Sequence, residues 1–118
     1  MAARADPSKP NRAADRPQPT DLSGTELLEL FGDEYTRAVF EAVAEKPRSG
    51  REVADAADVS RATAYRRLND LRDVGLVRSE LSLSRDGHHR ERFEVTDTAM
   101  SVSVGGDGIQ AAVRSRPE

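Results

Sequence analysis

The stretch VSRATAYRRLNDLRDVGLV, residues 59–77, decides the fold, and it carries four arginines in a chain that is acidic as a whole. When its residues are placed 100° apart, Ala64, Leu68 and Leu71 fall in one narrow sector. Gly75 then ends the helix. The opposite sector is polar and holds Ala62, Arg66, Asn69 and Asp73. The stretch therefore predicts a helix with one side against a core and an outward side that is rich in hydrogen-bond donors.

Length and composition limit the class of protein. With 118 residues, the chain has room for one domain with a modest core. It contains no cysteine, which excludes a disulfide framework, a thiol nucleophile, an iron–sulfur cluster and redox sensing through thiols. No apolar stretch reaches the roughly 18 residues of a membrane span, and residues 1–20 lack the apolar centre of a signal peptide. We therefore expect a cytoplasmic protein that does not enter a membrane.

Charge is unevenly distributed along the chain. The net charge is −3, and Lys9 and Lys46 are the only lysines among the 18 basic residues. This balance is typical of proteins adapted to high salt, although a GC-rich genome gives the same arginine bias. Residues 21–47 carry a net charge of −5, whereas residues 48–92 carry +2. Because local fields rather than net charge steer a polyanion, the second segment is the candidate for contact with one.

Capping signals predict four helices. Residues 23–26 and 49–52 both form capping boxes, in which a Ser and a Glu three residues later satisfy each other's backbone amides. The expected caps are Ser23, Asp33, Ser49 and Ser60, and the helices are expected to end near Gly32, Lys46, Asp58 and Val74. Only a very short connection separates the last two, so this part of the chain is predicted to be helix, tight turn, helix.

The first 20 residues are expected to form a disordered tail. They contain four prolines among Ala, Arg and Asp, with no apolar periodicity to drive packing. Their basic residues have two interpretations, an arm that grazes DNA or a solvated leader. Because Asp6 and Asp15 offset the basic charge, we favour the solvated leader and assign no site to the tail.

After Gly75 the apolar period changes from 3.6 to 2, which predicts strands. Residues 76–83 and 93–95 are expected to form an antiparallel hairpin, whose turn contains the Asp-Gly of residues 86–87. A second small hairpin is predicted over residues 102–113, around the turn Gly-Gly-Asp-Gly at 105–108. The expected fold class is therefore α+β, mainly α with a small β-hairpin.

The segment REVADAADVSRATAYRRLNDLRDVGLVRSE, residues 51–80, resembles the helix-turn-helix core of ArsR-type transcriptional regulators, especially the small single-domain regulators of halophilic archaea. The resemblance covers about residues 27–96. It implies a winged helix-turn-helix domain over residues 21–98, after the tail of residues 1–20, with residues 99–118 as a hairpin or tail extension. The metal sensors of this family use cysteines or clustered His and acids that this sequence lacks, so metal sensing is not implied.

The resemblance gives the arginines a target. In helix-turn-helix proteins the second helix enters the major groove with its N-terminal residues against the base edges. Applied to the helix at 60–74, this implies base contacts from Arg61, Ala62, Tyr65 and Arg66. Arg66 is the leading base reader, because a guanidinium binds guanine O6 and N7 together. Contacts to phosphate are expected from Ser60, Thr63, Arg67 and Arg72.

Two features of this helix have plainer interpretations. Arg66 and Arg67 can pair with Asp70, and Arg72 with Asp73, which makes the helix a solvated amphipathic one. Such pairs contribute only about 0.2–0.5 kcal/mol each, so they do not hold arginines away from phosphates. Tyr65 on the flank of the helix can simply pack on its neighbours.

The wing at residues 76–96 is the second expected DNA contact. Its tip offers Arg85, His88, His89 and Arg90, which suit the phosphate backbone or the minor groove. The alternative is that Asp86 and Glu91 neutralise the tip. Adjacent side chains on a strand point to opposite faces, so the His pair is not assigned to a metal.

An enzyme is not expected. The turn at 105–108 lacks the Lys of a phosphate-binding loop, and no Ser or carboxylate is placed beside the two histidines to form a triad. We predict a homodimeric, sequence-specific DNA-binding regulator of transcription, with no cofactor and no evident small-molecule ligand. Its dimer contact is expected in residues 22–31 or, less favoured, in residues 102–113. The alternative is a winged-helix module that binds another protein.

Overall fold

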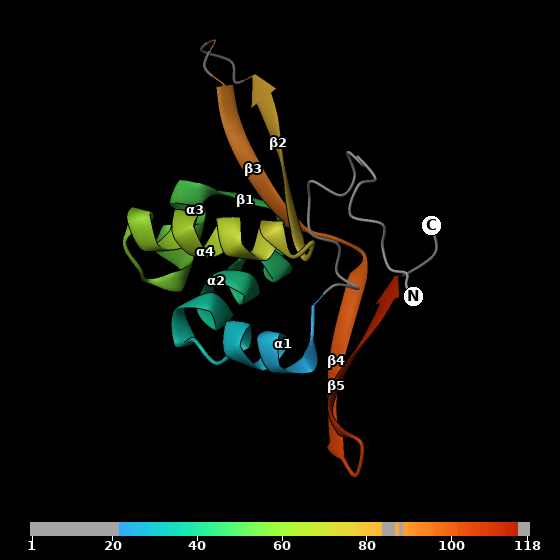
Figure 1. The fold of residues 1–118 in the computed structure, drawn as a ribbon. Helices are drawn as coiled ribbons and strands as arrows, with labels where there is room; N and C mark the ends of the chain where they lie inside the picture. The colour runs from blue at the N-terminus through green and yellow to red at the C-terminus, as the bar shows by residue number, and fades with distance from the viewer. Residues whose placement is uncertain (1–21, 84–86, 88, 116–118) are drawn as a thin grey trace, which may run out of the picture.

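A computed structural model of the chain describes residues 22–83, 87 and 89–115. In this part the protein has an α+β fold, with four helices and two small antiparallel sheets (Figure 1). The helices are α1 (Gly24–Phe31), α2 (Glu34–Glu45), α3 (Gly50–Ala57) and α4 (Arg61–Asp73). The strands are β1 (Arg48–Ser49), β2 (Val77–Leu83), β3 (His89–Val95), β4 (Thr98–Gly105) and β5 (Gly108–Ser115). The predicted tail, residues 1–20, lies outside the described residues.

All four helices begin at the predicted caps. Both capping boxes are complete: Ser23 Oγ accepts from the Glu26 amide at 3.0 Å, and Ser49 Oγ accepts from the Glu52 amide at 3.2 Å. In each box the Glu carboxylate accepts from the amide of the Ser in return. The caps therefore fix the helix starts locally, as expected from the sequence. Among the described residues, no helix combines the length and the apolar character needed to cross a membrane.

The core lies between the helices and the first sheet. The predicted inward sector of α4 is confirmed, because Ala64, Leu68 and Leu71 are completely buried. Around them lie the other fully buried large side chains, which are Val39, Val43, Val53, Val77 and Phe93. Helices α2, α3 and α4 all pack on one another, so α4 is held against two helices and is free on its outward side.

The first sheet has the order β1-β3-β2, with all pairs antiparallel. The predicted hairpin after Gly75 is present, but its second strand starts at His89 rather than near Phe93. The two-residue strand β1 was not predicted from the sequence. It places Arg48 opposite Phe93, and its shortness removes the alternation by which a strand is recognised. The hairpin of β2 and β3 extends beyond the helices (Figure 1).

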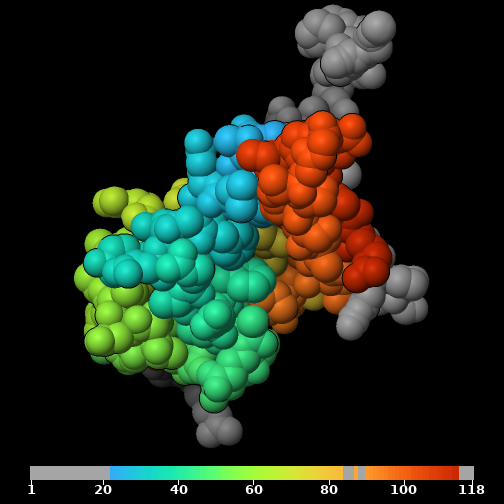
Figure 2. Space-filling model, turned by 90° about the horizontal axis from the view of Figure 1, so that it is seen from below, coloured from blue at the N-terminus to red at the C-terminus, as the bar shows by residue number. Residues whose placement is uncertain are grey.

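The second sheet is the hairpin β4–β5, which is longer than the predicted 102–113. It runs away from the helices in the direction opposite to the β2–β3 hairpin (Figure 1). The start of α1 lies against it, and Gly24 sits so close to Ile109 and to the backbone of Gln110 that a Cβ there would need one of them to move. Figure 2 shows α1 beside this hairpin, seen from below.

Candidate nucleic-acid interface

A three-residue connection joins α3 to α4. Asp58 ends α3 in the left-handed conformation, at φ 58° and ψ 50°, which a short polar residue tolerates better than most. The amide of Val59 donates to the carbonyl of Ala54 at 3.0 Å, which closes the turn. The chain therefore reverses sharply after α3, and the start of α4 is fixed relative to it.

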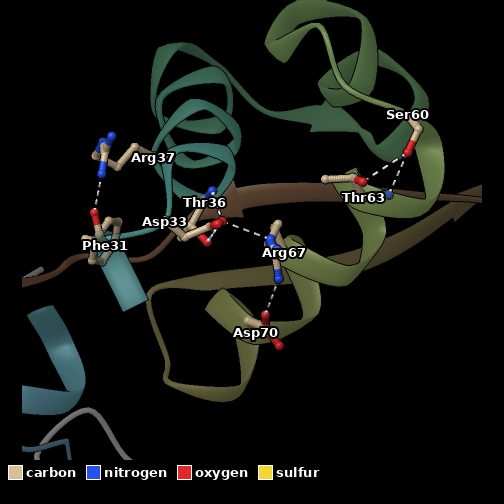
Figure 3. Close-up of polar contacts among 8 residues, drawn as sticks. All are labelled: Phe31, Asp33, Thr36, Arg37, Ser60, Thr63, Arg67 and Asp70. Carbon is tan, nitrogen blue, oxygen red and sulfur yellow. Dashed lines mark hydrogen bonds and ion pairs between the residues drawn. The ribbon is translucent and has the colours of Figure 1, made fainter. Parts of the chain in front are cut away.

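Ser60 caps α4 as predicted. Its Oγ accepts from the amide of Thr63 at 3.0 Å and donates to Thr63 Oγ1, also at 3.0 Å (Figure 3). Both hydroxyls are thus engaged with each other, while the amides of Arg61 and Ala62 lie in the first turn, where no helical carbonyl precedes them. The first turn offers amides and a positive dipole end to an anion.

The outward sector of α4 lies where the helical wheel placed it. The side chains of Ala62, Arg66, Asn69 and Asp73 are all exposed. Arg61 is exposed as well, one residue after the cap. Within residues 22–83, 87 and 89–115, neither Arg61 nor Arg66 forms an ion pair or a side-chain hydrogen bond. These two guanidinium groups are available to a ligand without giving up a contact inside the described protein.

Tyr65 packs on its neighbours and stays partly exposed. Its ring meets Phe93 edge-on, with 6.2 Å between the centroids and 71° between the planes. It also covers Gly50, where a Cβ would overlap the ring. Tyr65 therefore fastens α4 to the start of α3 and to β3, which agrees with the plainer interpretation of this residue. With 39% of its area exposed, it keeps a surface at the edge of the interface.

Arg67 is held by two carboxylates. Its Nε lies 3.0 Å from Asp33 Oδ2 without hydrogen-bond geometry, and its Nη1 lies 3.7 Å from Asp70 Oδ2 (Figure 3). Asp33 is also the cap of α2, where it accepts from the amide and the hydroxyl of Thr36. The Thr36 amide is the main cause that lowers the pKa of Asp33, and the charge of Arg67 adds to it. Arg67, predicted as a phosphate contact, is thus a partner of α2.

Arg72 connects α4 to the β2–β3 hairpin rather than to Asp73. Its Nη1 donates to Ser79 Oγ at 2.9 Å and to Glu91 Oε2 at 3.0 Å, and its Nη2 donates to Asn69 Oδ1 at 2.7 Å. Ser79 Oγ also donates to Glu91, at 2.9 Å. Consecutive residues on a helix point about 100° apart, which explains why the expected pair with Asp73 is absent. The network sets the direction of the hairpin relative to α4.

Basic and acidic side chains are unevenly placed around α4. Arg61 and Arg66 lie in its first half, whereas Asp70 and Asp73 line a shallow hollow of about 390 Å³ between α4 and α1. Glu26 and Glu29 of α1 line the same hollow. A polyanion is therefore attracted to the start of α4 and repelled from the acidic hollow between α4 and α1.

The predicted wing residues are only partly described. Arg85 and His88 lie outside the described residues, and of His89 only the backbone is placed, opposite Leu83. Arg90 is exposed and lies one position from Glu91 along β3, so it is on the opposite face of the hairpin from the Arg72 network. In the part of the chain that is described, no group of three His, Asp or Glu side chains could hold a metal ion.

Residues 28–100 match the family model of the HVO_A0261 N-terminal domain, which is well over half of the chain. The chain belongs to the HVO_A0261 N-terminal domain family. This family is haloarchaeal, in agreement with the composition expected for high salt. No curated protein sequence matches the chain. The matching family is not described as one of ArsR-type regulators, so that resemblance remains a prediction.

The part of the chain shared with the HVO_A0261 N-terminal domain contains the whole candidate interface. It runs from Leu28 in α1 to Met100 in β4, and so includes α4 and the β2–β3 hairpin. Sequence reasoning missed Glu91 and Ser79 as partners of Arg72, and it missed the exposure of Leu81 and Leu83 on β2. The alternation of the strand places both leucines on the face of Ser79, but the sequence does not show that the helices end before reaching them.

Proposed function

We propose that this protein is a winged helix-turn-helix regulator of transcription that binds double-stranded DNA sequence-specifically. In this assignment α3 and α4 are the helix pair, α4 is the recognition helix, and the β2–β3 hairpin is the wing. The order of the elements, the tight turn at Asp58 and the projection of the hairpin beyond the helices support it.

The observation that carries the proposal is the exposure of two arginines on α4. Arg61 and Arg66 are exposed, with no ion pair to the described residues, in the half of the helix that reads bases in helix-turn-helix proteins. Arg66 is the base reader, and the small Ala62 beside it leaves room for a thymine methyl group. The acidic hollow between α4 and α1 then faces away from the phosphates.

Arg67 and Arg72 take a positioning role in this proposal. Both are already paired, Arg67 with Asp33 and Arg72 with Glu91. The Arg72–Glu91 pair is exposed, and such pairs are worth only about 0–1 kcal/mol, so Arg72 can exchange Glu91 for a phosphate when DNA is present. The Arg67–Asp33 pair is half-buried, so Arg67 gives up its carboxylate less readily. Ser60 and Thr63 add the amide-rich start of α4, and Arg90 contributes charge from the wing.

The protein is proposed to act without catalysis, as a homodimer on a two-fold symmetric site. A different function, docking of another protein, is favoured by one observation. Leu81 and Leu83 of the wing are 68% and 66% exposed. Neighbouring exposed leucines on a projecting hairpin suit an apolar partner.

Selection of binding sites from a random pool of duplex DNA, with the full chain in high KCl, tests the proposal. We expect one enriched sequence. On it, Arg66→Ala should cost about 1–3 kcal/mol of specific binding and relax the preference at one base position. Arg114→Ala, which removes an equal charge from β5, is the control and should bind like wild type. Absence of an enriched sequence, or equal affinity of the Arg66 variant, contradicts the proposal and favours the protein-docking function.

A further inference from the structure

The hairpin β4–β5 has two open edges. In the described part of the chain it forms a sheet of only two strands, and no third strand pairs with either. A two-stranded sheet is marginally stable by itself and gains from a further strand or from packing. Here α1 packs against both strands, most closely where Gly24 meets Ile109 and Gln110. No strand among residues 22–83, 87 and 89–115 pairs with the outer edge of β4.

The edge of β4 lacks the features that normally prevent pairing with another chain. Natural edge strands are protected by charged residues, proline or bulges. Strand β2 carries Arg78 and Glu80, and β5 carries Arg114. By contrast β4, TAMSVSVG, has no charged residue and no proline over eight residues. This is notable in a chain of which 33% of the residues are charged.

The apolar face of β4 is only partly covered by its own chain. Met100 packs against the core, and Val102 is half-buried. Val104, two residues further on the same face, is 73% exposed. Across the hairpin it faces Ile109, which is itself 45% exposed. The end of the strand therefore offers apolar surface next to an open edge.

We propose that β4 pairs with β4 of a second copy of this chain, antiparallel, around a two-fold axis at Val102. Residues opposite each other in an antiparallel pair lie on the same face, so the axis must lie midway between a residue and its own copy. With the axis at Val102, the exposed Val104 lies beside Met100 of the second copy. Ser101 then lies opposite Ser103 of the second copy on the outer face.

The absence of charge favours a second copy as the occupant. In a two-fold interface a charged residue on the axis faces its own copy, and like charges placed symmetrically about the axis face each other. Strand β4 has no charged residue and is therefore free of such repulsion in any register. The result is a four-stranded sheet that links two copies. This moves the expected dimer contact from residues 22–31 to the hairpin. In α1, Gly24 and Leu27 are buried within the chain, and Leu28 is 47% exposed.

The oligomeric state of the full chain without DNA tests this pairing separately from the proposed function. Light scattering after gel filtration, over a range of protein concentrations, should show a dimer for wild type. The measurement is made at the lowest KCl concentration that preserves the circular dichroism spectrum, because salt screens the charges. A wild-type chain that stays monomeric at every concentration overturns the proposal.

A charge-swap experiment tests the register. In Ser101→Glu/Ser103→Glu, like charges face each other across the axis, and dimerisation should weaken about tenfold or more. Mixing this variant with Ser101→Lys/Ser103→Lys should restore dimers. Ser82→Glu is the matched control, since with Glu80 it creates the same pattern on the edge of β2. The proposed pairing is overturned if the Glu variant dimerises as tightly as wild type. It is also overturned if Ser82→Glu weakens dimerisation by as much, or if mixing the Glu and Lys variants does not restore dimers.

Hydrogen exchange on the wild type gives a result that does not depend on any variant. Amides of β4 should become slower to exchange as the protein concentration rises, because they pair in the dimer. Amides of β2 should not change. Exchange of β4 that is independent of concentration in a dimeric sample places the contact elsewhere and overturns the proposal.

Discussion

Arg72 Nη1 lies 3.0 Å from Glu91 Oε2, and this ion pair ties the last turn of α4 to the β2–β3 hairpin. Ser79 and Asn69 complete the network from either side. Both side chains of the pair are more than one-third exposed, so the pair contributes little to stability. Its importance lies in direction and charge: it aligns the hairpin with α4, and it neutralises a cation at the proposed DNA interface.

Replacing Glu91 with Gln releases the charge of Arg72 while keeping the shape of the side chain. The variant should bind DNA more tightly at low salt. Its plot of log affinity against log salt should be steeper by up to about 0.9, the value for one additional phosphate contact. Titrating duplex DNA over a wide range of KCl measures both effects.

The control is Glu94→Gln. Glu94 pairs with Arg78 at 2.7 Å, on the hairpin face opposite the Arg72 network. The substitution Glu94→Gln removes the same charge without releasing Arg72. The slope of its plot of log affinity against log salt should therefore change less than that of the Glu91 variant. Equal slopes for wild type and the Glu91 variant would show that Arg72 does not reach a phosphate.

Gly50 is expected to be sensitive to substitution because the ring of Tyr65 occupies the space of a side chain. Gly50→Ala should lower the free energy of unfolding by about 1–3 kcal/mol, the usual cost of overpacking. Urea denaturation measures it. Gly105→Ala is the control, since nothing lies within 4 Å of a Cβ there. Tyr65→Leu is then combined with Gly50→Ala. If removing the ring does not reduce the loss of unfolding free energy caused by Gly50→Ala, the ring of Tyr65 is not the cause of that loss.

The helices and the interface face of α4 could be predicted because their signals are local. The capping boxes at Ser23 and Ser49 involve residues three apart, and the apolar sector of α4 follows from the helical period. The second hairpin was also predicted, through its glycine-rich turn. These features require no knowledge of which segments meet in space.

The partners of Arg67 and Arg72 that lie far away in the sequence could not be predicted from it. Asp33 and Glu91 are distant along the chain, and they reach the arginines only because α2 and β3 pack beside α4. Many carboxylates compete for such pairs in an acidic chain, so sequence alone favours the nearest one. That preference was right for Asp70 with Arg67, three residues apart. It was wrong for Asp70 with Arg66 and for Asp73 with Arg72, two ion pairs that do not form within the described residues.

Stability should decrease in acid because two helix caps use carboxylates. The amide of Thr36 lowers the pKa of Asp33 below its usual 3.8, and the amide of Ser49 lowers that of Glu52 below its usual 4.5. As the pH falls, the unfolded chain therefore binds protons at these two carboxylates before the folded chain does. Their contribution to the free energy of unfolding is complete above about pH 4.5 and is lost as the pH falls through the lowered pKa values.

Asp33→Asn/Glu52→Gln tests this dependence. Asn and Gln keep capping hydrogen bonds but do not titrate, so the variant should lose less stability than wild type between pH 5 and acid. Urea denaturation at several pH values measures the loss. Asp107→Asn, in the turn of β4–β5, is the control for removal of a carboxylate. An acid dependence equal to that of wild type would show that the caps do not cause it.

The position of the wing relative to DNA can be tested at Leu83. This residue is 66% exposed near the end of β2, so a lysine there fits the monomer without loss of core packing. If the wing lies along the phosphate backbone, Leu83→Lys should raise DNA affinity at moderate salt and steepen the salt dependence by about 0.9. Thr25→Lys is the control: it adds the same charge to α1, which lies on the opposite side of the helices from the projecting end of the β2–β3 hairpin (Figure 1). Anisotropy titrations over a range of KCl separate the two variants, because a lysine on α1 only changes the net charge, whereas one at the wing forms a phosphate contact.

If both variants shift affinity equally, the hairpin is not near DNA. Its exposed leucines would then be better explained as a surface for a protein partner.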